Sequence, residues 1–167
     1  SLFSFFDFKS SVVLGVSIVF IFFIGLIDDI KKVSTIKKIM LQLFISIFIT
    51  YSLKFYDLRL VPFIDNDIIN AISIVIFILI VTNSINLIDG LDNLASGLSI
   101  IISITFIVLF NLIGYVHINY NLIVIIGCLF FLIIYNNFFN RVFLGDSGSL
   151  FLGWFFSIIS LFFLKHS

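Results

Sequence analysis

Long apolar segments alternate with short polar ones along the whole chain. Uncharged runs lie at about 11–27, 36–53, 68–86, 93–116, 118–139 and 149–164. Each run is near the roughly 17–25 residues that a helix needs to cross the hydrocarbon core of a bilayer. The pattern therefore predicts six membrane-spanning helices. The second run includes Lys37 and Lys38 near its start, the two charges within these otherwise uncharged runs, and we expect these side chains to snorkel towards the lipid headgroups.

The composition agrees with a membrane as the solvent. Hydrophobic residues make up 62% of the 167 positions and charged residues only 11%, which does not suit the surface of a water-soluble domain. We therefore expect an all-α, polytopic integral membrane helical bundle, with residues 1–167 forming part of one transmembrane domain. The net charge of zero gives no reason to expect a nucleic-acid partner.

Three polar motifs separate pairs of apolar runs. They are GLIDDIKKVS at 25–34, NSINLIDGLDNLASG at 83–97 and NRVFLGDSGS at 140–149, and they contain five of the nine acidic residues. Two spans fit between successive motifs, so all three should lie on one face of the membrane. Five basic residues lie near the motifs and four lie opposite, which favours a cytoplasmic motif face. Carboxylates gathered there suggest chemistry on a charged substrate.

The first motif contains the adjacent acids Asp28 and Asp29. Two neighbouring carboxylates repel each other, so they are comfortable in water, beside cations such as Lys31 and Lys32, or around a metal ion and phosphate. A hydrated end of a membrane span is the alternative interpretation of this pair.

The second motif repeats polar residues three positions apart. This spacing places four side chains along one side of a helical or tightly turned segment, namely Asn83, Asn86, Asp89 and Asp92. Amides and acids then line one surface. For the two asparagines, hydrogen bonding between membrane helices is an alternative role.

The third motif places Asp146 between Gly145 and a Ser-Gly-Ser sequence, directly before the last apolar run. Glycines allow a close backbone approach, and backbone amides at a helix start favour an anion such as phosphate. The alternative is a plain turn in which Asp or Ser caps the next helix.

Together, GLIDDIKK, KKIMLQ, NSINLIDGLDNLASG and VFLGDSGSLFLG resemble the signature stretches of the polyprenyl-phosphate N-acetylhexosamine-1-phosphate transferases. The resemblance covers nearly the whole chain. It implies a multi-pass transferase domain in the bacterial plasma (inner) membrane, with its active face in the cytoplasm. It also implies the reaction, in which a UDP-N-acetylhexosamine gives its sugar phosphate to a polyprenyl phosphate, undecaprenyl phosphate, with Mg²⁺ and release of UMP. The product starts a cell-envelope glycan.

The resemblance also implies roles for individual residues. Asp146 would be the metal ligand, and Asp28 and Asp29 would lie near the lipid phosphate. The remaining catalytic and substrate-binding positions would be Lys38, Asn83, Asn86, Asp89, Asp92 and Asn136. Which aspartate assists deprotonation of the lipid phosphate stays open, as does the choice between direct displacement and a covalent intermediate.

The chain departs from the family pattern in two ways. Asn93 replaces the glycine that usually follows GLD. The family's earlier spans and its later His-rich loop are missing from these 167 residues, so we expect a piece of a longer protein that is inactive alone.

The short spacing from Asp29 to Gln42 favours a GlcNAc-1-phosphate transferase over a phospho-MurNAc-pentapeptide transferase. Two alternatives come from other classes. An intramembrane aromatic prenyltransferase would show paired NxxxDxxxD-like motifs, which the Asp28–Asp29 pair and GDSGS do not fit. A cation transporter would place acids at mid-span, whereas these acids are expected at span ends.

Overall fold

The structure, a computed structural model, describes residues 8–58, 60, 66–90, 93–139 and 144–166. Within them six helices are long and apolar enough to cross a membrane, which confirms the six predicted spans. They are α1 (Phe8–Lys31), α2 (Thr35–Ser52), α3 (Asp67–Ile88), α4 (Leu94–Leu112), α5 (Asn119–Phe138) and α6 (Gly145–His166). Two short 3₁₀ helices connect them, η2 (Phe55–Asp57) and η3 (Val116–Ile118).

Three helix ends differ by four residues from the predicted runs, and the others agree more closely. Helix α1 continues to Lys31, so Asp28 and Asp29 lie in its last turns. Helix α4 ends at Leu112, because Gly114 follows with a left-handed φ of 80°. Helix α6 begins at Gly145, so the third motif forms the first turn of a helix. Hydropathy locates apolar residues, and it therefore missed helical turns made of polar and small ones.

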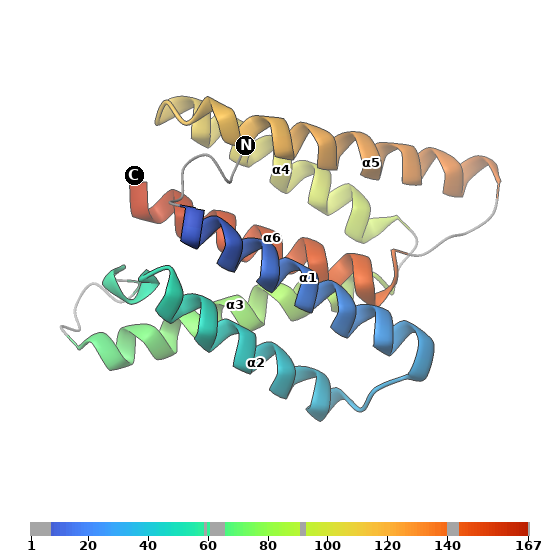
Figure 1. Ribbon diagram of the computed structural model, residues 1–167. Helices are drawn as coiled ribbons and strands as arrows, with labels where there is room; N and C mark the ends of the chain where they lie inside the picture. Colours follow the sequence, from blue (N-terminus) through green and yellow to red (C-terminus); the bar gives the residue numbers. More distant parts are fainter. Residues whose placement is uncertain (1–7, 59, 61–65, 91–92, 140–143, 167) are drawn as a thin grey trace.

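Helix α6 is the centre of the bundle. It packs against α1 and α3, and α2 packs on the other side of these two helices (Figure 1). In α6 67% of the span is buried, against at most 33% in each of the other five. Trp154 of α6 is almost fully buried, and its ring nitrogen donates to Ser17 Oγ of α1 at 3.4 Å.

Two glycines allow α6 to approach its neighbours closely. A Cβ atom added at Gly153 would lie 2.6 Å from the Cα atom of Thr82 on α3. One added at Gly25 of α1 would lie 2.4 Å from the Cα atom of Ser147. Small residues permit such backbone contact between membrane helices. The helices that carry the three motifs are therefore fixed against one another by backbone packing.

Helices α4 and α5 form a hairpin that packs mainly on itself, above the other helices in Figure 1. Its contact with α6 includes aromatic rings far from the motifs. Phe110 of α4 meets Phe162 and Phe163 of α6, with ring centroids 6.2 and 5.7 Å apart.

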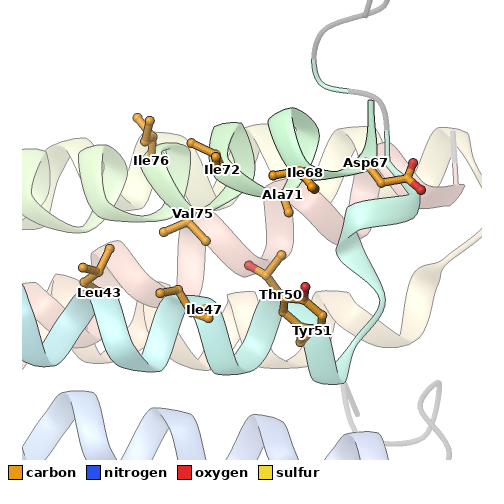
Figure 2. A pocket seen from close by; sticks show the side chains of 10 residues that line it. All are labelled: Leu43, Ile47, Thr50, Tyr51, Asp67, Ile68, Ala71, Ile72, Val75 and Ile76. Carbon is orange, nitrogen blue, oxygen red and sulfur yellow. The ribbon is translucent and has the colours of Figure 1, made fainter. Parts of the chain in front are cut away.

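An apolar groove of about 460 Å³ opens between α2 and α3 at the end of the bundle away from the motifs (Figure 2). Its walls are mostly aliphatic side chains such as Leu43, Ile47, Ile72 and Val75, and Asp67 lies at one end. We call it the outer groove.

Candidate functional site

The ends of α1, α3 and α6 that carry the motifs enclose a cleft of about 590 Å³. Residues from all three motifs line it, among them Asp28, Asp29, Asn86, Asp89 and Asp146. The chain thus brings together segments more than a hundred residues apart in sequence. We call this the motif cleft.

Lys38 is at the centre of the polar contacts beside this cleft. Its Nζ atom donates to Asp28 Oδ2 at 2.7 Å and to Asp146 Oδ2 at 2.9 Å. It also lies 3.4 Å from Asn86 Oδ1. The expectation that Lys38 snorkels to the headgroups is therefore wrong. The side chain turns into the bundle, where it is only 9% exposed, because two carboxylates compensate its lost hydration.

Asp28 also organises the end of its own helix. Its Oδ1 atom accepts from the Val33 amide at 2.6 Å, just beyond the last residue of α1. Lys32, with a left-handed φ of 47°, reverses the chain between α1 and α2. This tight reversal brings Lys38, ten residues later, back to the Asp28 carboxylate.

Asp146 is held through both of its carboxylate oxygens. Lys38 binds Oδ2, and Asn86 Nδ2 donates to Oδ1 at 2.5 Å. Asn86 Nδ2 also lies 2.8 Å from Ser149 Oγ, one turn further along α6. Sequence reasoning did not assign Ser149, although its position three residues after Asp146 places it on the same side of a helix.

Asp29 faces the start of α6. Its Oδ1 atom accepts from the Asp146 amide at 2.7 Å, and its Oδ2 atom accepts from the Ser147 amide at 3.0 Å. These are amides that lack a partner within their own helix. The amides predicted to hold a phosphate are thus hydrogen-bonded to a carboxylate of the protein.

Asp89 directly follows the last residue of α3 and lies half-buried in the motif cleft. Burial raises the pKa of its carboxyl to about 6, although a hydrogen bond from the Gly145 backbone lowers it; the nearby Asp146 and Asp29 charges raise it further. Asp92, the next acid of the same motif, lies outside the described residues.

Asn83 lies one turn deeper in α3 than Asn86. It donates to Gln42 Oε1 at 2.6 Å and to the Leu79 carbonyl at 2.8 Å, and it does not line the cleft. Gln42 is fully buried on α2, four residues after Lys38. Asn83 therefore makes the bond between helices that was its alternative role. The four-residue spacing from Lys38 was the available signal for Gln42.

Asn136 lies apart from the cleft lining. Its Nδ2 atom donates to Asn93 Oδ1 at 2.8 Å, and Asn93 in turn donates to Asn137 Oδ1 at 3.2 Å. Asn93 has a left-handed φ of 59°, which asparagine tolerates better than most residues. Asparagine can therefore occupy the position where the resemblance leads us to expect glycine. The Asn93 hydrogen bonds connect the start of α4 to the end of α5.

The donor set suits a hard divalent cation such as Mg²⁺. Within the described residues no three acidic, His or Cys side chains converge as a ready-made metal site. Mg²⁺ commonly uses only one or two carboxylates and completes its shell with water and substrate phosphates. Asp28 and Asp146 both contact one ammonium group within 2.9 Å, so a positive charge already lies between them.

Comparison with known proteins finds one matching family model and relatives whose names describe related transferases. The family model of glycosyl transferase family 4 matches residues 11–164. A Bacillus subtilis protein named "Probable undecaprenyl-phosphate N-acetylglucosaminyl 1-phosphate transferase" is 40% identical over 143 residues, which cover 83% of this chain and 40% of that protein.

Two relatives carry the name phospho-N-acetylmuramoyl-pentapeptide-transferase. The Clostridium perfringens protein is 33% identical over 78% of this chain and 46% of its own length. The Staphylococcus epidermidis protein is 36% identical over 83% of this chain and 49% of its own length. The chain thus spans less than half of each of these three relatives. With a family model matched along almost all of its length, and with the family's motifs gathered in one cleft, the chain belongs to glycosyl transferase family 4.

Proposed function

We propose that the full-length protein transfers N-acetylhexosamine 1-phosphate from a UDP-sugar to undecaprenyl phosphate. The observation that carries this proposal is a network of hydrogen bonds at one end of a membrane bundle. It connects the side chains of Asp28, Lys38, Asn86 and Asp146. A lipid phosphate would meet a water-soluble nucleotide at such a place. The names of the relatives support undecaprenyl phosphate as the acceptor.

In this reaction an oxygen of the lipid phosphate attacks the β-phosphorus of the UDP-sugar. The bond from that phosphorus to the bridging oxygen breaks, and UMP leaves with the electron pair. A lipid pyrophosphoryl sugar remains. Both reactants are anions, so the site must offset their repulsion. A bound Mg²⁺ would neutralise charge on the pyrophosphate.

The chain's own residues would prepare the site for these anions. Asp146 would hold the metal ion and Asp28 would lie near the lipid phosphate, while Lys38 would keep the two carboxylates at a fixed separation. Lys32, which lines the cleft and is exposed, would contact phosphate oxygens. Asn86 would hold Asp146 in one orientation, since it binds the oxygen that Lys38 does not. Positioning of this kind supplies much of the rate in phosphoryl transfer.

For the sugar we propose GlcNAc. The Bacillus relative, whose name specifies N-acetylglucosaminyl transfer, is 40% identical, and the two pentapeptide transferases are 33% and 36% identical. The short segment between Asp29 and Gln42 points the same way. Transfer of phospho-MurNAc-pentapeptide is the second candidate, because relatives of that name cover as much of the chain.

We further propose that the motif cleft faces the cytoplasm from the bacterial inner membrane, where a UDP-sugar would be available. A cation transporter fits the structure less well. The carboxylates lie at helix ends, and transport would need them near mid-span.

The test uses the purified full-length protein with undecaprenyl phosphate, Mg²⁺ and either UDP-GlcNAc or UDP-MurNAc-pentapeptide. We expect release of UMP and formation of lipid pyrophosphoryl GlcNAc only with the first nucleotide. Release only with the second would replace the sugar assignment and keep the reaction. Failure with both, in a protein that is folded and inserted in membrane, would contradict the function.

A further inference from the structure

Asp28 and Asp29 are adjacent, yet they contact different parts of the molecule. We propose that Asp29 is a positioning residue that caps α6 and thereby fixes Asp146, and that it does not bind the lipid phosphate. The inference rests on the proposed function in so far as Asp146 serves the transfer reaction.

The first support is the hydrogen bonding of Asp29. Each carboxylate oxygen accepts from a different backbone amide at the start of α6, those of Asp146 and Ser147. A carboxylate is favoured there because the amides have no partner in the helix and carry partial positive charge. Both carboxylate oxygens of Asp29 therefore bind the first turn of α6.

The second support is the packing around these bonds. Gly25, one turn before Asp29, touches the backbone of Ser147 so closely that a Cβ atom would lie 2.4 Å from its Cα atom. At Gly145 a Cβ atom would lie 3.0 Å from Asp29 Oδ2. Gly145 also has a φ of 72°, a left-handed conformation that favours glycine. Both glycines therefore make room for the carboxylate to reach the first turn of α6.

The third support is the contrast with Asp28. Successive residues of a helix point about 100° apart, so two adjacent acids face different neighbours. Asp28 is buried and binds Lys38 and the Val33 amide. Asp146 is therefore held at three places: by Asp29 at its backbone, and by Lys38 and Asn86 at its carboxylate.

A capping role has a distinct chemical consequence. Groups that orient a metal ligand typically change metal affinity by about 10–100-fold when they are removed. A group that binds the lipid phosphate would change the KM for that lipid instead. The two roles can therefore be separated by measuring metal binding and lipid KM in the same variants.

The experiment compares Asp29→Ala, Asp29→Asn and wild type in the full-length protein. Asparagine keeps one acceptor oxygen and is a good helix cap, whereas alanine is a poor one. The control is Asp67→Ala, which removes an acid from the first turn of α3 at the opposite end of the bundle. Readouts are hydrogen exchange in the segment 144–150, Mn²⁺ affinity by electron paramagnetic resonance, and kcat and KM for undecaprenyl phosphate.

We expect Asp29→Ala to speed exchange in the first turn of α6 by about fivefold and to weaken Mn²⁺ binding by about 10–100-fold. Its kcat should fall, while the KM for the lipid should stay within about twofold of wild type. That change is much smaller than the one expected in Mn²⁺ affinity. Asp29→Asn should recover most of the exchange protection and of the Mn²⁺ affinity. Asp67→Ala should resemble wild type in all four measurements.

Unchanged exchange and Mn²⁺ affinity in Asp29→Ala, with a raised lipid KM, would overturn the proposal and assign Asp29 to the lipid phosphate. If Asp29→Ala does not fold, Asp29→Asn and Asp29→Ser provide the comparison. An equal loss of exchange protection and of Mn²⁺ affinity in these two variants would also overturn the proposal. Hydrogen exchange needs neither metal nor substrate. It therefore tests the cap even if the wild-type protein transfers no sugar phosphate, which would reject only the function.

Discussion

The two ends of the bundle contain cavities of opposite chemistry. The motif cleft, about 590 Å³, is lined by four carboxylates, one lysine and one asparagine among other residues, whereas the outer groove, about 460 Å³, has mostly aliphatic walls. Helix α3 contributes to both, with Asn86 at one end and Ile72 at the other. In a membrane an apolar wall needs no partner, but a buried charge needs one. Among the described residues, the Asp146 carboxylate of the motif cleft has such partners in Lys38 and Asn86, whereas the walls of the outer groove are mostly aliphatic.

Predictions that separate the two ends can be ordered by the size of their effect. The largest contrast is in sidedness. In a Cys128→Ser background, which removes an exposed thiol, single cysteines at Ser34 and Ser147 should react with an impermeant reagent from one side of the membrane. A cysteine at Asn66 should react from the other. If Ser34 and Ser147 were labelled from opposite sides, the motif cleft would not exist in the membrane.

Replacing the metal-binding candidate should reduce turnover severely. In Asp146→Asn the negative charge is lost while the shape is kept. We expect kcat to fall by at least about 10²-fold, since each 1.4 kcal/mol of lost transition-state stabilisation is about tenfold in rate. Asp67→Asn, beside the outer groove, should stay near wild type. The measurement is UMP release by folded protein, and normal turnover in Asp146→Asn would exclude the proposed role.

Removing the shared cation should lower stability as well as activity. Lys38→Met leaves the Asp28 and Asp146 carboxylates without their common partner. We expect a loss of about 2 kcal/mol, below the roughly 3–5 kcal/mol for a fully buried pair, because the Asp146 side chain is 31% exposed.

The matched control for this substitution is Lys165→Met at the other end, where the ammonium contacts the Leu53 carbonyl at 3.2 Å. It should change stability by less than about 1 kcal/mol. Thermal unfolding in detergent measures both. Equal losses in Lys38→Met and Lys165→Met would show that the two ends do not differ in how they hold charge.

The smallest expected effect is a pH dependence at Asp89. Burial first, and then repulsion from Asp146 and Asp29, raise the pKa of this carboxyl from 3.8 to about 6. The folded protein thus binds a proton more tightly than the unfolded chain, so stability falls as pH rises between these two values. Because Asp89 is half-exposed, we expect a change of less than about 1 kcal/mol. In metal-free buffer, Asp89→Asn should lack this part of the pH dependence; an identical profile would contradict the shift.

The fold could be predicted from the sequence to a large extent, because the bilayer demands long apolar helices. Six runs gave six helices, and an even number of spans between motifs anticipated a shared cleft. The ends of the helices could be predicted less well from the sequence. The start of α6 at Gly145 consists of polar and small residues, which hydropathy assigns to a turn.

The candidate site was harder to predict because its contacts depend on packing between helices. The sequence shows Asp28 and Asp29 as one acidic pair, yet the position of Gly25 against Ser147 determines that Asp29 reaches α6. Likewise, no local pattern distinguishes Asn83, bonded to Gln42, from Asn86, bonded to Asp146. Family resemblance identifies such residues without specifying which neighbour each one binds.

The central position of α6 has a consequence for synthesis of the protein in the cell. Helix α6 is made last among the six described spans, yet α1 and α3 pack mainly against it. Translation adds roughly 5–20 residues per second, so α1 would wait on the order of ten seconds for this partner. Until then Gly25 lacks the Ser147 backbone against which it packs, Thr82 lacks Gly153, and Lys38 can bind Asp28 but not Asp146. The Asp28 and Asp146 carboxylates thus come together only after the last of these spans has been made.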